Sequence, residues 1–93
     1  MTLHLLGASP SDRATFESCR STLTEQDTLL LLEEGCYWAL PHHRQELSRI
    51  PARVVALGPD CLARGIATEG LKTVDDAEFV VLATEHARTV SWY

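Results

Sequence analysis

The segment TLLLLEE at residues 28–34 limits the possible folds of this chain more than any other part of it. Its four consecutive leucines show no alternation between apolar and polar side chains. A strand with one solvent-facing side alternates, whereas a central strand of a parallel sheet is covered on both faces and does not. The segment therefore predicts a buried strand in a sheet with helices on both faces.

Four other segments have the pattern of strands, and helix-like segments separate them. They are residues 2–6, 53–60, 71–75 and 89–93. Parallel strands need a crossover connection, which is usually a helix, so this alternation favours a parallel sheet. We expect an α/β fold: one small domain over residues 1–93, with a mainly parallel sheet of about five strands flanked by helices.

The first long helix is predicted from Pro10 to about Leu23. Ser9 is placed to cap it, and Pro10 suits the first helical position. Phe16 and Cys19 fall on one face of this helix, which is the spacing of a side that packs on a core. Other helical segments are predicted at residues 35–41, 61–66 and 75–87, and residues 42–51 are expected to form either a second short helix or a loop.

Charge and composition limit the classes of partner. The net charge is −5 and the eight Lys and Arg residues form no dense run, which argues against a nucleic-acid surface made by this chain alone. No apolar run reaches the ~20 residues of a membrane span, and the N-terminus lacks the basic region of a signal peptide. Three cysteines without CxxC spacing fit reduced thiols, so the expected location is the cytoplasm.

Cofactor and metal motifs are not recognisable in the sequence. Its glycines match neither a P-loop nor GxGxxG. His42 and His43 with Cys36 match no zinc spacing and predict a polar loop. His4 and His86 are expected to be packing or surface residues. We therefore expect no cofactor and no metal.

The three cysteines remain as candidates for chemistry. Cys36 and Cys61 each follow a predicted strand, and ligand sites of parallel sheets gather at the carboxyl ends of strands. A helix start at that edge lowers a thiol pKa, so position favours these two as thiolates. Cys19 lies deeper in its helix and shares a face with Phe16 and Leu23, so local spacing favours a core residue.

Several segments match one family in order and spacing. They are LHLL…SP, FESC, LLLLEEGCYWAL, VVALGPDCLARGI, VDDAEFVVLATEH and the final VSW. Over nearly its whole length the chain resembles the DsrH/TusB family of small sulfur-relay proteins, which have the DsrE-like fold. The resemblance implies a heterohexamer with two sister subunits of the DsrE/TusD and DsrF/TusC types. It also implies that the complex handles persulfide sulfur and needs no cofactor.

The family has two branches with different end acceptors. In the TusB branch, sulfur passes from a cysteine desulfurase toward 2-thiolation of the tRNA wobble uridine. In the DsrH branch, the complex serves sulfur oxidation. Either role implies a downstream sulfur-acceptor protein, with no direct contact between this chain and nucleic acid or membrane. The sequence leaves both branches open, and we favour tRNA thiolation.

The resemblance also ranks the cysteines. DsrH-type proteins have a cysteine on the first helix, and FESC places Cys19 there, so Cys19 is the leading candidate persulfide carrier. Cys61 is the second candidate, because the sister subunit carries its active cysteine after its third strand. The DsrH/TusB pattern usually has an apolar residue at this point, so the favoured alternative is that Cys61 only replaces an apolar side chain. A carrier thiolate attacks a donor persulfide and passes the terminal sulfur on. The chain would then be a carrier within a sulfurtransferase complex rather than a stand-alone enzyme.

The alternative is a non-catalytic interaction subunit that shapes the complex. The core spacing of Cys19 supports this alternative. So do the aromatic residues available to fill interfaces, which are Tyr37, Trp38, Trp92 and Tyr93. The two hypotheses differ in one structural property, because a carrier needs its Cys19 sulfur to be reachable from outside.

Overall fold

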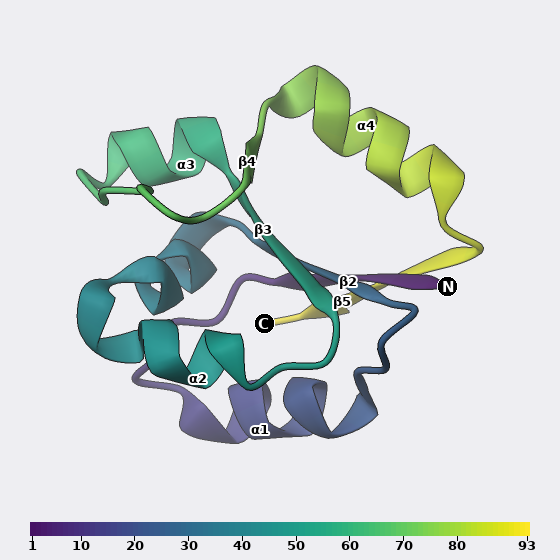
Figure 1. Cartoon of the computed structure of the whole chain (residues 1–93), viewed down its shortest axis with the longest axis horizontal. Coiled ribbons are helices and arrows are strands. Elements are labelled where there is room, and N and C mark those ends of the chain that lie inside the picture. The colour runs from purple at the N-terminus through teal and green to yellow at the C-terminus, as the bar shows by residue number, and fades with distance from the viewer.

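The computed structural model describes residues 1–93 and contains one sheet with helices on both faces (Figure 1). The strands are β1 (Thr2–Leu6), β2 (Thr28–Leu31), β3 (Arg53–Leu57), β4 (Thr73–Val74) and β5 (Arg88–Trp92). Their order in the sheet is β4-β3-β2-β1-β5, and every neighbouring pair is parallel. The predicted α/β fold with five parallel strands is confirmed.

Helices lie on both sides of the sheet (Figure 1). The helical elements are α1 (Arg13–Thr22), the 3-10 helices η1 (Glu33–Ala39) and η2 (Pro41–His43), α2 (Arg44–Ser48), α3 (Gly58–Ala63) and α4 (Asp76–Glu85). Figure 1 shows α1 and α2 below the sheet and α3 and α4 above it. None of these helices has the length and apolar character that crossing a membrane requires.

Strand β2 is buried along its whole length, as its unbroken leucine run predicts. Leu29 and Leu31 belong to the larger core cluster, which includes side chains of α1 and η1. Leu30 belongs to the smaller cluster, which includes Leu82 of α4. Each buried leucine contributes roughly 1.5–3 kcal/mol, so the strand requires cover on both faces.

The larger core is built around two stacked aromatic rings. Phe16 of α1 and Trp38 of η1 have ring centroids 3.8 Å apart, and both side chains are buried. The guanidinium of Arg13 lies 5.7 Å from the centroid of the Trp38 ring, and it forms an ion pair with Glu46 of α2. This packing joins α1, η1 and α2 into one layer.

Helix α1 begins later than the sequence predicts. The Ser9 hydroxyl bonds to Ser11 (2.6 Å) instead of capping a helix. Asp12 is the actual cap, and its carboxylate accepts a hydrogen bond from the Thr15 amide (3.3 Å) and from the Thr15 hydroxyl (2.7 Å). A carboxylate also suits the partial positive charge of a helix N-terminus.

At the carboxyl edge of the sheet, β2 and β3 both end earlier than predicted. After Leu31 the chain turns into η1 through Glu33, a non-glycine residue with φ of 51°. Gly35 then packs directly on β1, because a Cβ at this position would lie 1.9 Å from the Leu6 carbonyl oxygen. Strand β3 ends at Leu57 because Pro59 falls in the first turn of α3.

Candidate functional site

All three cysteines are free thiols and all are buried. The exposed fractions are 1% for Cys19, 0% for Cys36 and 1% for Cys61. The thiolate is the reactive form in sulfur transfer, and it needs both ionisation and access. Each candidate thiol therefore has to be judged by its surroundings.

Cys19 lies on the inner face of α1, in the same core cluster as Phe16 and Leu23. Burial raises its pKa to about 12. The neighbouring Arg20 forms an ion pair with Glu17 at 2.6 Å on the outer surface of α1, so its positive charge is directed toward Glu17 and not toward the Cys19 thiol. The core position that local spacing indicates for Cys19 is confirmed, and its role as a persulfide carrier stays a prediction.

Cys36 and Cys61 are brought together at the carboxyl edge of the sheet. Burial raises the pKa of the Cys36 thiol, and the neighbouring Cys61 thiol raises it further. Cys36 also donates a weak hydrogen bond to the Leu31 carbonyl oxygen (3.7 Å). The prediction that position makes Cys36 a thiolate is wrong, because loss of water outweighs any benefit of the strand end. Cys61 is equally enclosed in the larger core cluster.

Polar contacts fasten the two thiol-bearing segments to each other. The Glu33 amide donates to the Asp60 carboxylate (2.7 Å). Arg64 forms an ion pair with Glu34 (3.1 Å) and donates to the Asp60 carbonyl oxygen (3.2 Å). The contacts of Glu33 with Asp60 and of Glu34 with Arg64 hold η1 against α3, the helix that carries Cys61.

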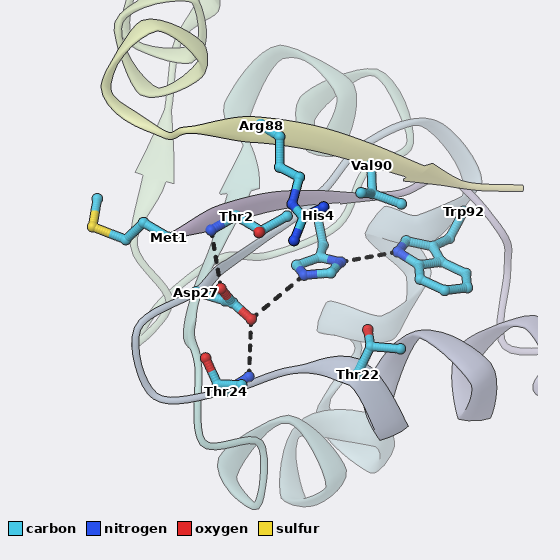
Figure 2. A pocket seen from close by; sticks show the side chains of 9 residues that line it. All are labelled: Met1, Thr2, His4, Thr22, Thr24, Asp27, Arg88, Val90 and Trp92. Carbon is cyan, nitrogen blue, oxygen red and sulfur yellow. Dashed lines mark hydrogen bonds and ion pairs between the residues drawn. The ribbon is translucent and has the colours of Figure 1, made fainter.

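The opposite, amino edge of the sheet carries an open cavity of about 420 Å³ (Figure 2). Its lining residues are Met1, Thr2, His4, Thr22, Thr24, Asp27, Arg88, Val90 and Trp92. Sequence reasoning did not find this cavity, because its residues come from distant segments that only the parallel pairing of β5 with β1 brings together.

A chain of polar contacts from Trp92 through His4 to Asp27 forms one wall of the cavity. The Trp92 indole donates to His4 Nδ1 (3.1 Å), and His4 Nε2 lies 3.5 Å from Asp27 Oδ2. Asp27 also accepts hydrogen bonds from the Thr2 and Thr24 amides, both 3.0 Å long. Burial opposes the charged form of Asp27, but these two amide bonds together with His4 hold its pKa below the ordinary value.

The same contacts leave His4 without a free ring nitrogen. Burial lowers its pKa, although Asp27 acts in the opposite direction. A general base or a metal ligand must offer an unpaired nitrogen, and both nitrogens of His4 face protein partners. Both ring nitrogens of His86 also have hydrogen-bond partners, the Leu82 carbonyl oxygen at 2.7 Å and the Thr28 hydroxyl at 2.9 Å. No group of three or more His, Cys, Asp or Glu side chains is placed to hold a metal ion.

The outer surface carries several large apolar side chains. Their exposed fractions are 83% for Leu62, 61% for Val80, 52% for Val81, 61% for Tyr93 and 59% for Met1. Among the aromatic residues expected to fill interfaces, Tyr93 is exposed, whereas Tyr37 and Trp92 are half-buried. The expectation is wrong for Trp38, which is 1% exposed and stacks on Phe16 in the core.

Comparison with known proteins gives consistent matches over nearly the full length. A family model described as "DsrH like protein" matches residues 8–89. The chain is 34% identical to "Protein TusB" of Shigella sonnei (strain Ss046) and 33% identical to "Protein TusB" of Escherichia coli O81 (strain ED1a), covering 97% of this chain and 99% of each relative. The solution NMR structure of protein Tm0979 from Thermotoga maritima superposes with a TM-score of 0.71 at 26% identity, over 92% of this chain and 94% of that one.

Proposed function

Because the chain belongs to the DsrH family, we propose that it is a subunit of a cytoplasmic sulfur-relay complex that acts in 2-thiolation of the tRNA wobble uridine. Similarity to proteins named TusB supports the tRNA-thiolation branch. Cys19 within FESC is the one feature typical of the sulfur-oxidation branch. The structural neighbour supports the fold on which this assignment rests.

Within the complex, the proposed part of this chain is to supply binding surface rather than a reactive thiol. The burial of Cys19 carries this proposal, since its side chain is 1% exposed and its pKa is raised to about 12. At neutral pH such a thiol is almost entirely protonated, and a protonated thiol neither attacks a persulfide nor accepts its sulfur.

The proposed partners are sister subunits of the DsrE/TusD and DsrF/TusC types, assembled as a heterohexamer, and a downstream sulfur-acceptor protein. Exposed apolar residues on the outer side of α4 support a role in assembly, because Val80 and Val81 face solvent in the lone chain. Tyr93 adds an exposed aromatic ring, a residue type enriched at interfaces.

The competing assignment makes Cys19 a persulfide carrier. Its support is the position of Cys19 in FESC, where DsrH-type proteins have a cysteine. This assignment requires assembly to move α1 far enough to expose the Cys19 sulfur, since the sulfur is enclosed in the lone chain. Persulfide mapping on the assembled complex separates the two assignments.

The proposal is tested in cells that lack the chain and in a co-purification. We expect loss of the chain to abolish 2-thiouridine at the tRNA wobble position, measured by mass spectrometry of digested tRNA. We also expect the chain to co-elute with both sister subunits in size-exclusion chromatography. Unchanged thiolation without the chain, or a chain that elutes alone, would contradict the proposal.

A further inference from the structure

Cys36 and Cys61 form the one pair of thiols in which each side chain neighbours the other. Cys36 belongs to η1, which follows β2, and Cys61 belongs to α3, which follows β3. Because β2 and β3 are adjacent parallel strands with Leu31 opposite Ala56, the two connections turn over the same edge of the sheet. Both sulfurs lie in the larger core cluster, with exposed fractions of 0% and 1%.

The approach of the two segments is built into the fold. Gly35 lets η1 pack against the Leu6 carbonyl oxygen, where any larger residue would clash. The hydrogen bond from the Glu33 amide to the Asp60 carboxylate and the ion pair of Arg64 with Glu34 then connect η1 to the α3 segment. Contacts outside the pair therefore hold the two thiol-bearing segments against each other, and a reversible disulfide needs such an approach.

We propose that Cys36 and Cys61 act as a dithiol that reduces one sulfane sulfur to hydrosulfide and closes to a disulfide. The inference rests on the proposed function, because a sulfur relay supplies the persulfide that the dithiol would consume. The substrate class is a low-molecular-weight or protein persulfide. No other oxidant or reductant takes part.

The reaction balances in two exchange steps. In the first, the Cys61 thiolate attacks the terminal sulfur of the donor R–S–SH, a Cys61–S–SH persulfide forms, and the donor leaves as RS⁻. In the second, the Cys36 thiolate attacks Sγ of Cys61, the Sγ–Sγ bond forms, and the terminal sulfur leaves as HS⁻. The sulfane sulfur gains two electrons and the two cysteines lose them, while their two protons pass to water or to the departing anions.

The pair therefore ends a sulfur transfer instead of continuing it. A persulfide placed on Cys61 has a thiol beside its inner sulfur, so the terminal sulfur is expelled before an acceptor protein collects it. A carrier cysteine, by contrast, needs a persulfide with no second thiol next to it. Cys61 is on this basis a discharge point for surplus sulfane sulfur, not the second carrier that its position in the chain indicates.

Access to the pair comes through α3. This helix has six residues, its outer side carries the 83% exposed Leu62, and it is followed by Gly65 in a left-handed conformation. Short segments with exposed outer sides open locally at low free energy, so α3 can turn away while the sheet stays folded. In the closed state burial raises the pKa of Cys36 and keeps its thiol protonated. Opening of α3 releases the contacts of Glu33 with Asp60 and of Glu34 with Arg64 and lets water and the persulfide reach both thiols, and the second exchange step follows as the two segments come back together.

The test uses the full chain with glutathione persulfide as the probe. Intact-mass and peptide mass spectrometry follow the protein, and a sulfide-selective probe follows the solution. We expect the parent chain to lose the mass of two hydrogen atoms, to gain a Cys36–Cys61 cross-link, and to release one hydrosulfide per chain. The Cys36→Ser variant should instead gain one sulfur atom at Cys61 and release no hydrosulfide, and Cys19→Ser should behave like the parent.

A parent chain that retains a stable persulfide on Cys61, or that leaves both cysteines unmodified under excess persulfide, would overturn the proposal. The parent measurement decides this even where the Cys36→Ser chain does not fold. Failure here leaves complex assembly and tRNA thiolation untouched, whereas failure of the proposed function appears as a chain that neither assembles nor affects thiolation.

Discussion

Alkylation of Cys19 by iodoacetamide should be far slower in the folded chain than in the unfolded chain. The thiolate is the reacting form, and burial raises the Cys19 pKa from an ordinary 9.0 to about 12. That rise lowers the thiolate fraction at neutral pH by about a thousandfold. The 1% exposed fraction of the side chain lowers the rate further, because the reagent cannot reach the sulfur.

The assay measures alkylation of each cysteine by peptide mass spectrometry over time, with the urea-unfolded chain as the reference. A matched control moves the thiol by one position along α1. Ser18 is exposed on the same helix, so a chain with Ser18→Cys and Cys19→Ser presents its thiol to solvent. We expect the thiol introduced at position 18 to react within about tenfold of its rate in the unfolded chain, the range of an accessible thiol.

The same series also defines the contrary outcome. If Cys19 in the folded chain reacts within about tenfold of its unfolded rate, its sulfur is reachable and largely unperturbed. The core position would then not protect the thiol, and the carrier assignment would gain over the interaction subunit. Slow alkylation of Cys19 beside fast alkylation of the shifted thiol supports the interaction subunit.

Three further outcomes follow from the fold. Gly35→Ala should lower the free energy of unfolding by several kcal/mol, because the new Cβ would lie 1.9 Å from the Leu6 carbonyl oxygen. Glu33→Gly should be neutral or stabilising by up to about 1 kcal/mol, because it relieves a φ of 51°; urea denaturation checks both variants. Since burial lowers the His4 pKa, the unfolded chain binds more protons below pH 6.5, so thermal stability should fall as pH drops through 6.5 toward the folded pKa. His4→Gln should flatten this pH dependence, and an unchanged slope would show that His4 is not its source.

The main features of the fold follow from sequence pattern alone. An unbroken run of four leucines is typical of a strand covered on both faces, and β2 has that position in the sheet. Alternation of strand-like and helix-like segments then favours a parallel sheet. The start of α1 is harder to predict, since Ser9 and Asp12 both have side chains suited to capping and only tertiary context selects Asp12.

The candidate site is only partly predictable, because burial of a thiol depends on the layer above it. Cys36 follows a buried strand, as an active-site residue of a parallel sheet does. Cys36 is enclosed because Gly35 lets η1 pack onto β1. The local sequence pattern does not predict that Gly35 contacts Leu6. The contact of His4 with Trp92 likewise depends on the pairing of the first strand with the last, across almost the whole chain.

The most decisive experiment on the proposed interaction subunit is sulfur transfer by the assembled relay with Cys19→Ala in this chain. Alanine is small and apolar, so it suits a core position where the side chain is 1% exposed. With a persulfidated donor and purified sister subunits, we expect the variant complex to pass sulfur to its acceptor at the rate of the parent complex. Loss of transfer in an intact variant complex, together with persulfide mapped to Cys19 in the parent, would contradict the proposed interaction subunit.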